Sequence, residues 1–346
     1  MPHSHHGGEP VRGQDAVSHS PHFEGRFGRM FRLDPLRPSN AAIDELTAHM
    51  RDAAEAPSHD NPRIPAGYTY LGQFIDHDIT FDPMSELQKR NDPDALVDFR
   101  TPRFDLDSLY GSGPSDDPFL YESNRPGTRG VALLVGVNPQ DEDVEPHDLP
   151  RNQQGRALIG DPRNDENIMV SQLHLLFIRF HNKVVDKVRA ERPQLKGRAL
   201  LDACQSIVRW HYQWIVVHDF LERVTGAETA GGVLNGERQY FTWENAPFMP
   251  VEFSAAAYRF GHSMIRPHYD LNGANKRIPI FAEADDPGPF DQLGGFRRLP
   301  FGWTLDWSLF FKIGRGEPQL SRKIDTKLSP PLFKLPSATD PGRHAL

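Results

Sequence analysis

The fold of this protein is decided by the stretch GQFIDHDIT at residues 72–80. Its apolar spacing predicts a helix over residues 66–78. On such a helix Gln73, Asp76 and His77 share one face, because they stand at i, i+3 and i+4. Two carboxylates beside one histidine are costly inside an apolar segment unless the charges have partners. A solvated helix end is the plain alternative, and the choice depends on the rest of the chain.

Composition sets broad limits on function. The chain has 346 residues, of which 38% are hydrophobic, enough for one large domain or two. A net charge of −8 argues against nucleic-acid binding. The single cysteine, Cys204, excludes an internal disulfide framework and fits a reducing compartment or a bacterial protein. Without a signal-like apolar run or a membrane span, we expect a cytoplasmic or non-classically secreted protein.

The rest of the chain predicts a mainly α fold with long loops and little β structure. Further helices are expected over residues 40–50, from Asp161-Pro162 to about 192, over 199–224 and over 254–265. The 199–224 helix is aromatic-rich and is expected to be a buried scaffold. A short apolar run at 131–137 is the candidate strand. Residues 1–24 are rich in histidine, glycine and proline and are interpreted as a disordered tail, followed by one domain over 25–346.

Three further patterns could carry chemistry. GDPRNDEN at residues 160–167 places Arg163 and Glu166 three apart, which by itself predicts only a weak surface ion pair. His262 lies in an apolar helical pattern, where a lone histidine is more often a hydrogen-bonded core residue than a ligand.

The last pattern is rich in oxygen ligands. Thr101, Asp105 and Asp107 lie in one loop, and Asp78 is rotated about 100° from the face that carries His77. Ca²⁺ takes six to eight oxygen ligands from such groups. An extended loop would point Asp105 and Asp107 to one side and the alternating apolar residues to the other.

Together these segments resemble the animal-type haem peroxidases of the peroxidase–cyclooxygenase superfamily. GQFIDHDIT, GDPRNDEN, LHLLFIRFHN at residues 173–182 and RFGHS at residues 259–263 occur in the family's order. The resemblance runs from about Gly25 to the end of the chain. It implies a multi-helical haem peroxidase fold, and the lone Cys204 suggests the bacterial branch.

The resemblance also implies roles for single residues. His77 matches the distal histidine, Gln73 the glutamine beside it, Arg163 the distal arginine and His262 the proximal iron ligand. Asp76 and Glu166 match the carboxylates that many members esterify to haem b. The calcium ligands correspond to Asp78, Thr101, Arg103 through its carbonyl, Asp105 and Asp107.

The chemistry implied is peroxide reduction. His77 would move the proton from the iron-bound oxygen to the departing one, and Arg163 would stabilise the developing charge. The ferryl oxidant so formed would oxidise a halide, thiocyanate or a small aromatic donor. Calcium at Asp78 would fix the backbone that aims His77.

Two alternatives remain open. A fatty-acid dioxygenase of the same superfamily would carry a radical-forming tyrosine three residues before His262, where this chain has Arg259. Tyr258 stands four residues before His262, and a helix would turn its side chain about 100° from that position. A non-catalytic, calcium-binding interaction domain would retain only the fold. Family members usually continue into a segment that supplies an asparagine partner for the proximal histidine. We therefore expect a C-terminal part of the family domain to be missing, or to come from a second chain.

Overall fold

The computed structural model describes residues 25–333 except Arg32, Pro35, 53–55, 83–97, Pro102, 138–141, Glu237, 242–247, 282–290 and Arg315. The predicted histidine-rich tail at 1–24 therefore lies outside the described residues. Helices dominate the described part, and the strands form only two-stranded pairs. None of the described helices has the length and apolar character needed to cross a lipid bilayer.

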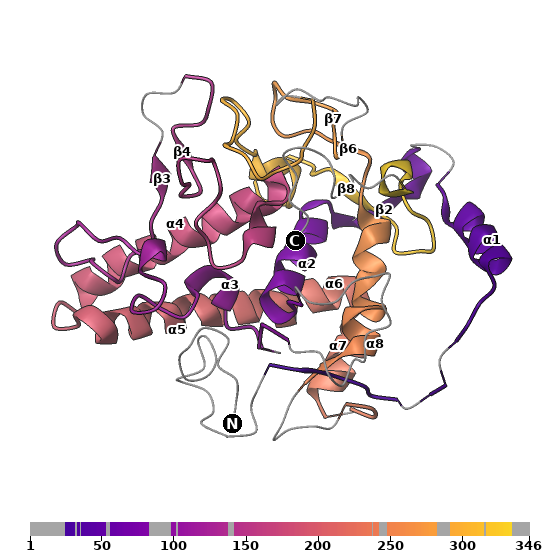
Figure 1. Cartoon of the computed structure of the whole chain (residues 1–346), viewed down its shortest axis with the longest axis horizontal. Coiled ribbons are helices and arrows are strands. Elements are labelled where there is room, and N and C mark those ends of the chain that lie inside the picture. The colour runs from indigo at the N-terminus through magenta and orange to yellow at the C-terminus, as the bar shows by residue number, and fades with distance from the viewer. Residues whose placement is uncertain are drawn as a thin grey trace.

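The helices follow one another along the chain with loops of varied length (Figure 1). The α-helices are α1 (Asn40–Met50), α2 (Gly67–Ile79), α3 (Asp107–Tyr110), α4 (Ile168–Glu191), α5 (Gly197–Ile215), α6 (Leu221–Thr225), α7 (Ala227–Leu234) and α8 (Val251–Ser254). A π-helical turn, η5 (Val216–Phe220), joins α5 to α6. The 3₁₀ segments are η1 (Pro57–His59), η3 (Pro118–Leu120), η4 (Pro162–Asp165), η6 (Ala257–Met264), η7 (Trp307–Leu309) and η8 (Pro330–Phe333).

The strands are short and serve as ties between distant segments. The parallel pair is β1 (Phe27–Gly28) with β5 (Met249–Pro250). The antiparallel pairs are β2 (Asp60–Pro65) with β8 (Leu320–Arg322), β3 (Gly136–Val137) with β4 (His147–Asp148), and β6 (His268–Tyr269) with β7 (Ile278–Pro279). The predicted mainly α fold with little β structure is confirmed.

The core forms where α2 packs against the long antiparallel pair α4 and α5 (Figure 1). Phe74 of α2 stacks on Phe177 of α4, with ring centroids 5.0 Å apart and an angle of 3° between the planes. Tyr212 of α5 meets both rings edge-on, at 6.1 and 5.8 Å. All three side chains are buried, and this aromatic cluster fixes the position of α2.

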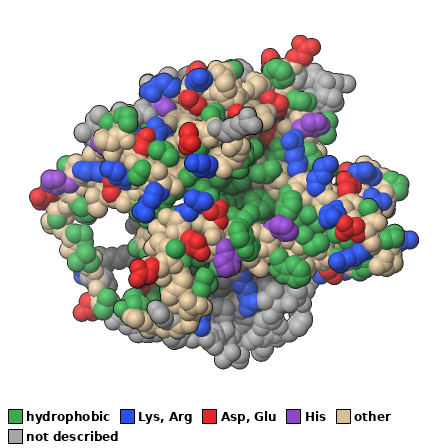
Figure 2. All heavy atoms as spheres, turned by 180° about the vertical axis from the view of Figure 1, so that it is seen from behind, with side chains coloured by type: hydrophobic (Ala, Val, Ile, Leu, Met, Phe, Trp, Pro, Cys, Tyr) green, Lys and Arg blue, Asp and Glu red, His purple; other side chains and the backbone are tan. Residues whose placement is uncertain are grey.

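The opposite face of the molecule is hollowed. Figure 2 shows hydrophobic side chains gathered around a depression near the middle of this face, with histidine side chains close by. Helix α1 buries none of its residues and stands at the edge of the molecule in Figure 1.

Two helix predictions are confirmed closely. Helix α2 agrees with the predicted 66–78 to within one residue. Helix α1 matches 40–50, and the Ser39 hydroxyl caps it by accepting a hydrogen bond from the Ala42 N–H at 3.2 Å. The single cysteine, Cys204, is buried in the core.

The start of the long helix was predicted too early. Asp161 and Pro162 open the 3₁₀ turn η4, whereas α4 begins at Ile168. The reason is a second cap, because the Asn167 side chain accepts a hydrogen bond from the Val170 N–H at 2.9 Å. A short 3₁₀ turn and a long α-helix, each with its own cap, therefore stand where one helix was expected.

The predicted 199–224 helix forms as three consecutive segments, and its aromatic residues are only partly buried. Tyr212 and Phe220 are buried as expected, but Trp210 and Trp214 are 67% and 60% exposed. The buried face of α5 includes Val208 and Tyr212, four residues apart. Trp210 lies about 200° around the helix from Val208, so it must face away from the core.

Two other predicted elements differ from the structure. Ala256, at φ −128° and ψ −73°, interrupts the 254–265 helix and separates α8 from η6. The 131–137 strand is reduced to Gly136–Val137. The Asn182 side chain accepts from the Leu133 N–H at 2.8 Å and donates to its carbonyl at 2.9 Å, and so takes the groups that a neighbouring strand would need.

The aromatic cluster gives a direct test of the core. We expect Phe177→Ala to lower the free energy of unfolding by about 3–5 kcal/mol, because it removes a buried ring and leaves a cavity. Trp214→Ala, on the exposed side of α5, should change it by no more than about 0.5 kcal/mol. Denaturant titration followed by circular dichroism measures both, and equal losses would show that α4 and α5 pack differently.

Candidate functional site

A cavity of about 290 Å³ lies between α2 and η6. Six residues that the sequence singled out line it, namely Gln73, Asp76, His77, Arg163, Glu166 and His262. The structure therefore brings together, in one cavity, segments almost two hundred positions apart in the sequence. Three of the predicted calcium ligands, Asp78, Asp105 and Asp107, do not line this cavity and form a separate cluster.

The orientation of His77 is set by an amide. Its Nδ1 lies 2.8 Å from the Oδ1 of Asn164, and an amide oxygen can only accept a hydrogen bond. Nδ1 therefore carries the proton, and Nε2 keeps its lone pair. Because His77 lines the cavity, this lone pair is available for a proton from a bound molecule.

Asn164 is itself held by His174 of α4. The Asn164 side-chain nitrogen lies 3.0 Å from the Nδ1 of His174, which accepts its hydrogen bond. Burial lowers the pKa of His174 to about 3, so this ring stays neutral and remains an acceptor. The hydrogen-bond chain His77–Asn164–His174 thus fixes one tautomer of His77.

Neither Asn164 nor His174 was predicted as a site residue. Both lie inside the motifs quoted above, at residues 160–167 and 173–182, and both are fully buried polar residues. Burial of an amide beside a histidine is the signal that would have revealed them, and it cannot be read from one sequence.

The carboxylates of the cavity have polar partners. Asp76 accepts from the Arg259 guanidinium at 3.2 Å and from the Thr80 hydroxyl at 3.2 Å. Glu166 accepts a hydrogen bond from the Gln73 side-chain amide, and its Oε1 lies 3.7 Å from His77 Nε2. Polar groups of both signs therefore surround the His77 imidazole.

Arg163 lines the cavity but directs its hydrogen bonds toward the end of α2. It donates to the Asp161 carboxylate at 2.8 Å and to the His77 carbonyl at 3.1 Å. Its guanidinium lies 4.6 Å from the centroid of the Phe81 ring. These contacts hold the main chain of His77 in place.

His262 approaches the cavity from η6. Its Nδ1 lies 2.9 Å from the Arg259 carbonyl, which can only accept, so Nδ1 carries the proton and Nε2 keeps its lone pair. A Cβ placed on the neighbouring Gly261 would meet no atom within 4 Å, which leaves open space beside the imidazole. Two imidazoles, each with its Nδ1–H directed at an oxygen acceptor, thus line one cavity, an arrangement that could hold a haem between two histidines.

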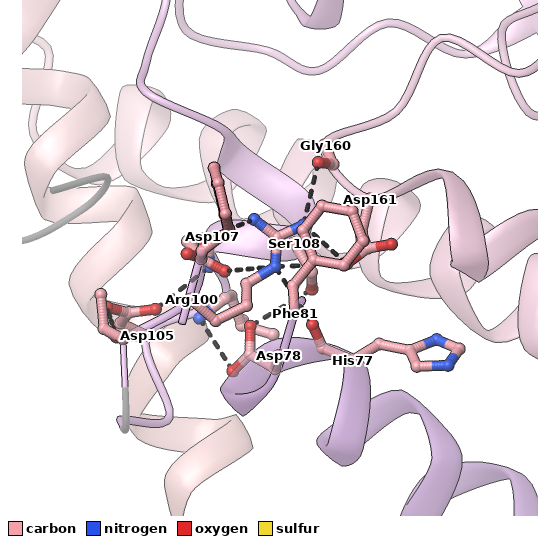
Figure 3. Close-up of polar contacts among 12 residues, drawn as sticks. His77, Asp78, Phe81, Arg100, Asp105, Asp107, Ser108, Gly160 and Asp161 are labelled. Carbon is pink, nitrogen blue, oxygen red and sulfur yellow. Dashed lines mark hydrogen bonds and ion pairs between the residues drawn. The ribbon is translucent and has the colours of Figure 1, made fainter. Parts of the chain in front are cut away.

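A buried acidic cluster lies behind this cavity. Asp78, Asp105 and Asp107 each offer an oxygen within 4.8 Å of the others, and all three are buried. Figure 3 shows that His77 and Asp78 leave α2 in different directions, as the helical rotation predicted. Asp78 accepts from the Ser108 hydroxyl and from the Leu106 N–H, both at 3.2 Å.

The loop that supplies the cluster is not extended, contrary to the alternation predicted from the sequence. Leu106 adopts φ 58°, a left-handed conformation, and α3 begins at Asp107. The Thr101 hydroxyl donates to Asp105 at 2.7 Å. The Arg103 N–H donates to the Thr101 carbonyl at 2.7 Å, so these residues form one tight loop. A ligand role for the Arg103 carbonyl stays a prediction.

The chemistry of this donor set fits a hard divalent cation. Burial, together with the charge of Asp105, raises the pKa of Asp78 to about 7. Burial also raises the pKa of Asp105. Three carboxylates and a nearby hydroxyl offer only oxygen ligands, and a bound Ca²⁺ would stabilise their charged forms.

Arg100 connects the acidic cluster with the cavity (Figure 3). Its side chain is fully buried, and its Nη2 lies 2.6 Å from Asp161 Oδ2. Its Nε lies 3.4 Å from Asp107 Oδ1 and donates to the His77 carbonyl at 3.2 Å. Burial opposes ionisation of Asp161, but the guanidinium groups of Arg100 and Arg163 hold its pKa well below the usual range.

We expect Arg100→Met to lower the free energy of unfolding by about 3–5 kcal/mol, because it leaves buried carboxylates without their cation. Lys187→Met provides the control: its ion pair with Glu191 is exposed, and its loss should cost less than about 1 kcal/mol. Thermal and denaturant unfolding of both variants measure the difference. A similar cost for the two variants would contradict a structural role for Arg100.

Known proteins resemble this chain in sequence and in fold. Human eosinophil peroxidase is 28% identical over 218 residues, which cover 57% of this chain but 29% of that protein. Mouse myeloperoxidase is 29% identical over 212 residues, covering 55% of this chain and 28% of that protein. This chain thus matches less than a third of the length of either relative. Peroxidase A from Dictyostelium discoideum shares the fold with a TM-score of 0.53 at 14% identity, covering 89% of this chain and 65% of that chain.

The profile of the family described as "Animal haem peroxidase" matches residues 85–299, more than half of the chain. The matched range begins after His77 and includes Arg163, Glu166 and His262. The chain therefore belongs to the animal haem peroxidase family.

Proposed function

We propose that this protein is a haem-dependent peroxidase that reduces hydrogen peroxide and oxidises a small donor. The observation that carries the proposal is the single cavity lined by both His77 and His262. Each imidazole has its Nδ1 proton committed to an oxygen acceptor, so each Nε2 is free to act. Bound haem would supply the redox chemistry that cleaves the peroxide bond and passes its oxidising power to the donor.

The protein residues would then divide the remaining work. His262 Nε2 would hold the iron, and its Nδ1–H bond to the Arg259 carbonyl would fix the ring. His77 Nε2 would accept the proton of hydrogen peroxide and return it to the departing oxygen, as base and then acid. The Asn164 hydrogen bond supports this step, because it stabilises the proton on Nδ1 throughout.

Three further cavity residues complete the proposal. Gln73 and Glu166 stay close to His77 Nε2 and would orient peroxide or water there. Arg163 would add positive charge beside the departing oxygen while it holds the His77 carbonyl. Asp76 and Glu166 are the cavity carboxylates that would form ester bonds to haem. Haem that resists extraction with acidic solvent would support those bonds.

The donor would be small. The wall of the cavity combines arginine with aromatic side chains, which suits a halide, thiocyanate or a small aromatic molecule beside a bound haem. Tyr258 also lines the cavity, but its hydroxyl donates to the Gly72 carbonyl at 3.0 Å. This bond favours a structural role for Tyr258 over the radical role that a fatty-acid dioxygenase would need.

The central experiment compares three variants after haem supplementation. We expect His262→Ala to lose or strongly shift the Soret band, because the iron loses its ligand. His77→Ala should retain haem but react with hydrogen peroxide about 10²–10⁴-fold more slowly. Asn164→Leu should cause a smaller loss, on the order of tenfold, because His77 keeps its ring but not its fixed tautomer.

Stopped-flow absorption measures the peroxide reaction, and steady-state assays with bromide, thiocyanate and a phenol identify the donor. His49→Ala, on the exposed helix α1, is the matched control and should behave like the wild type. Wild-type protein that binds no haem would instead indicate a non-catalytic calcium-binding domain. Fatty-acid oxygenation without donor peroxidation would contradict the proposal in favour of a dioxygenase.

We further propose that the acidic cluster binds Ca²⁺ through Asp78, Asp105 and Asp107, with Thr101 and the Arg103 carbonyl as further ligands. Removal of calcium with a chelator should lower the midpoint of thermal unfolding, because buried carboxylates would lose their countercharge. Asp107→Asn should weaken calcium binding, whereas Asp116→Asn, on an exposed part of the following loop, should not. Calorimetric titration with Ca²⁺ measures both, and equal affinities would contradict this assignment.

A further inference from the structure

A second cavity of about 290 Å³ lies next to β8 and is separate from the one that contains His77. It is lined by Arg51, Asp52, His59, Ser263, Arg322, Lys323, Asp325, Lys327 and Ser329. We propose that this cavity binds a small oxyanion, either a phosphate group or a carboxylate, through Arg322 and the lysine and arginine side chains around it. The family assignment and the proposed peroxidase activity are not needed for this inference.

The lining carries an excess of positive charge. Four cationic side chains face two carboxylates, Asp52 and Asp325. Asp52 is already engaged, because its carboxylate lies 2.9 Å from the Nδ1 of His59. Asp325 accepts a hydrogen bond from the Lys327 N–H at 2.7 Å. In a chain of net charge −8, such a concentration of positive charge is local and marks a place for an anion.

The wall behind the cavity does not remove this excess. Asp60 accepts from Arg322 at 2.9 Å and from Arg266 at 2.6 Å, so one carboxylate serves two guanidinium groups. Arg322 also donates to the Ala56 carbonyl at 2.8 Å. A further negative charge in the cavity would therefore compensate a buried cation that Asp60 only partly neutralises.

Arg322 supplies the most specific observation. The residue is 4% exposed, and its Nε is buried without a hydrogen-bond partner among the residues that the structure describes. A buried, charged N–H without an acceptor is costly. Guanidinium groups bind carboxylate and phosphate oxygens through paired N–H donors, and Nε is one of the donors in that fork. An oxyanion in the cavity would place its negative charge beside this guanidinium.

The size and position of the cavity narrow the ligand. Its volume exceeds what a single halide ion needs, and its small extent excludes a nucleic-acid strand. The Ser263 and Ser329 hydroxyls donate to the carbonyls of Phe260 and Ile265, so charge and not hydroxyl donation must dominate recognition. Ser263 follows His262 directly, which places the anion site behind the segment that carries the imidazole.

Calorimetric titration of the full chain tests the proposal, with inorganic phosphate in one arm and succinate in the other. Ionic strength is held constant with potassium chloride in both. We expect one anion per chain in at least one arm. Arg322→Lys keeps the charge but loses the planar guanidinium, and should weaken binding about tenfold. Lys323→Gln should weaken it a few-fold, because it removes one exposed charge at the cavity.

Lys187→Gln, which removes an exposed charge from α4, is the matched control and should leave binding unchanged. If Arg322→Lys does not fold, as judged by circular dichroism, the double variant Arg51→Gln and Lys323→Gln decides the question. Stronger binding in the phosphate arm would identify a phosphate ligand, and stronger binding in the succinate arm a carboxylate. Absence of binding in both arms, or equal affinity of all the variants, would overturn the proposal.

Discussion

The buried guanidinium of Arg100 is the interaction on which the rest of the structure depends. It lies between the Asp161 and Asp107 carboxylates and also donates to the His77 carbonyl. A cation in this position allows the Asp161 and Asp107 carboxylates to be buried. It also ties the end of that helix to η4 and α3, three segments that hydrophobic packing alone would not align so closely. The position of the His77 imidazole follows from this arrangement.

The sequence predicted those parts of the fold in which local pattern and tertiary packing agree. Helix α2 has a clear apolar period, and its predicted faces are those observed, with His77 on the cavity and Asp78 on the acidic cluster. Prediction failed where side chains take over backbone hydrogen bonds. Asn167 caps α4 later than expected, and Asn182 occupies both main-chain groups of Leu133. Such contacts join positions that no local period relates.

The candidate site shows the same division. Its titratable residues could be named because the motifs that contain them resemble those of a known family. Asn164 and His174 could not, because their importance comes from a hydrogen-bond chain between η4 and α4. The role of Arg163 also became more specific, because its contacts with Asp161 and the His77 carbonyl make it a support for the helix end as well as a cavity residue.

The π-helical turn between α5 and α6 has a consequence for how this protein can vary. This turn holds one residue more than an α-helical turn would, and it places Phe220 on the cavity wall while Asp219 accepts a hydrogen bond from Tyr68 at 2.6 Å. A one-residue deletion there would restore regular α-helical winding and leave the later side chains of the helix close to their present orientation, because the π turn accommodates one extra residue within about the rotation of an α-helical turn. The contacts of Asp219 and Phe220, which lie within the turn, would be the ones at risk, so the length of this segment matters mainly for the cavity wall and less for α6.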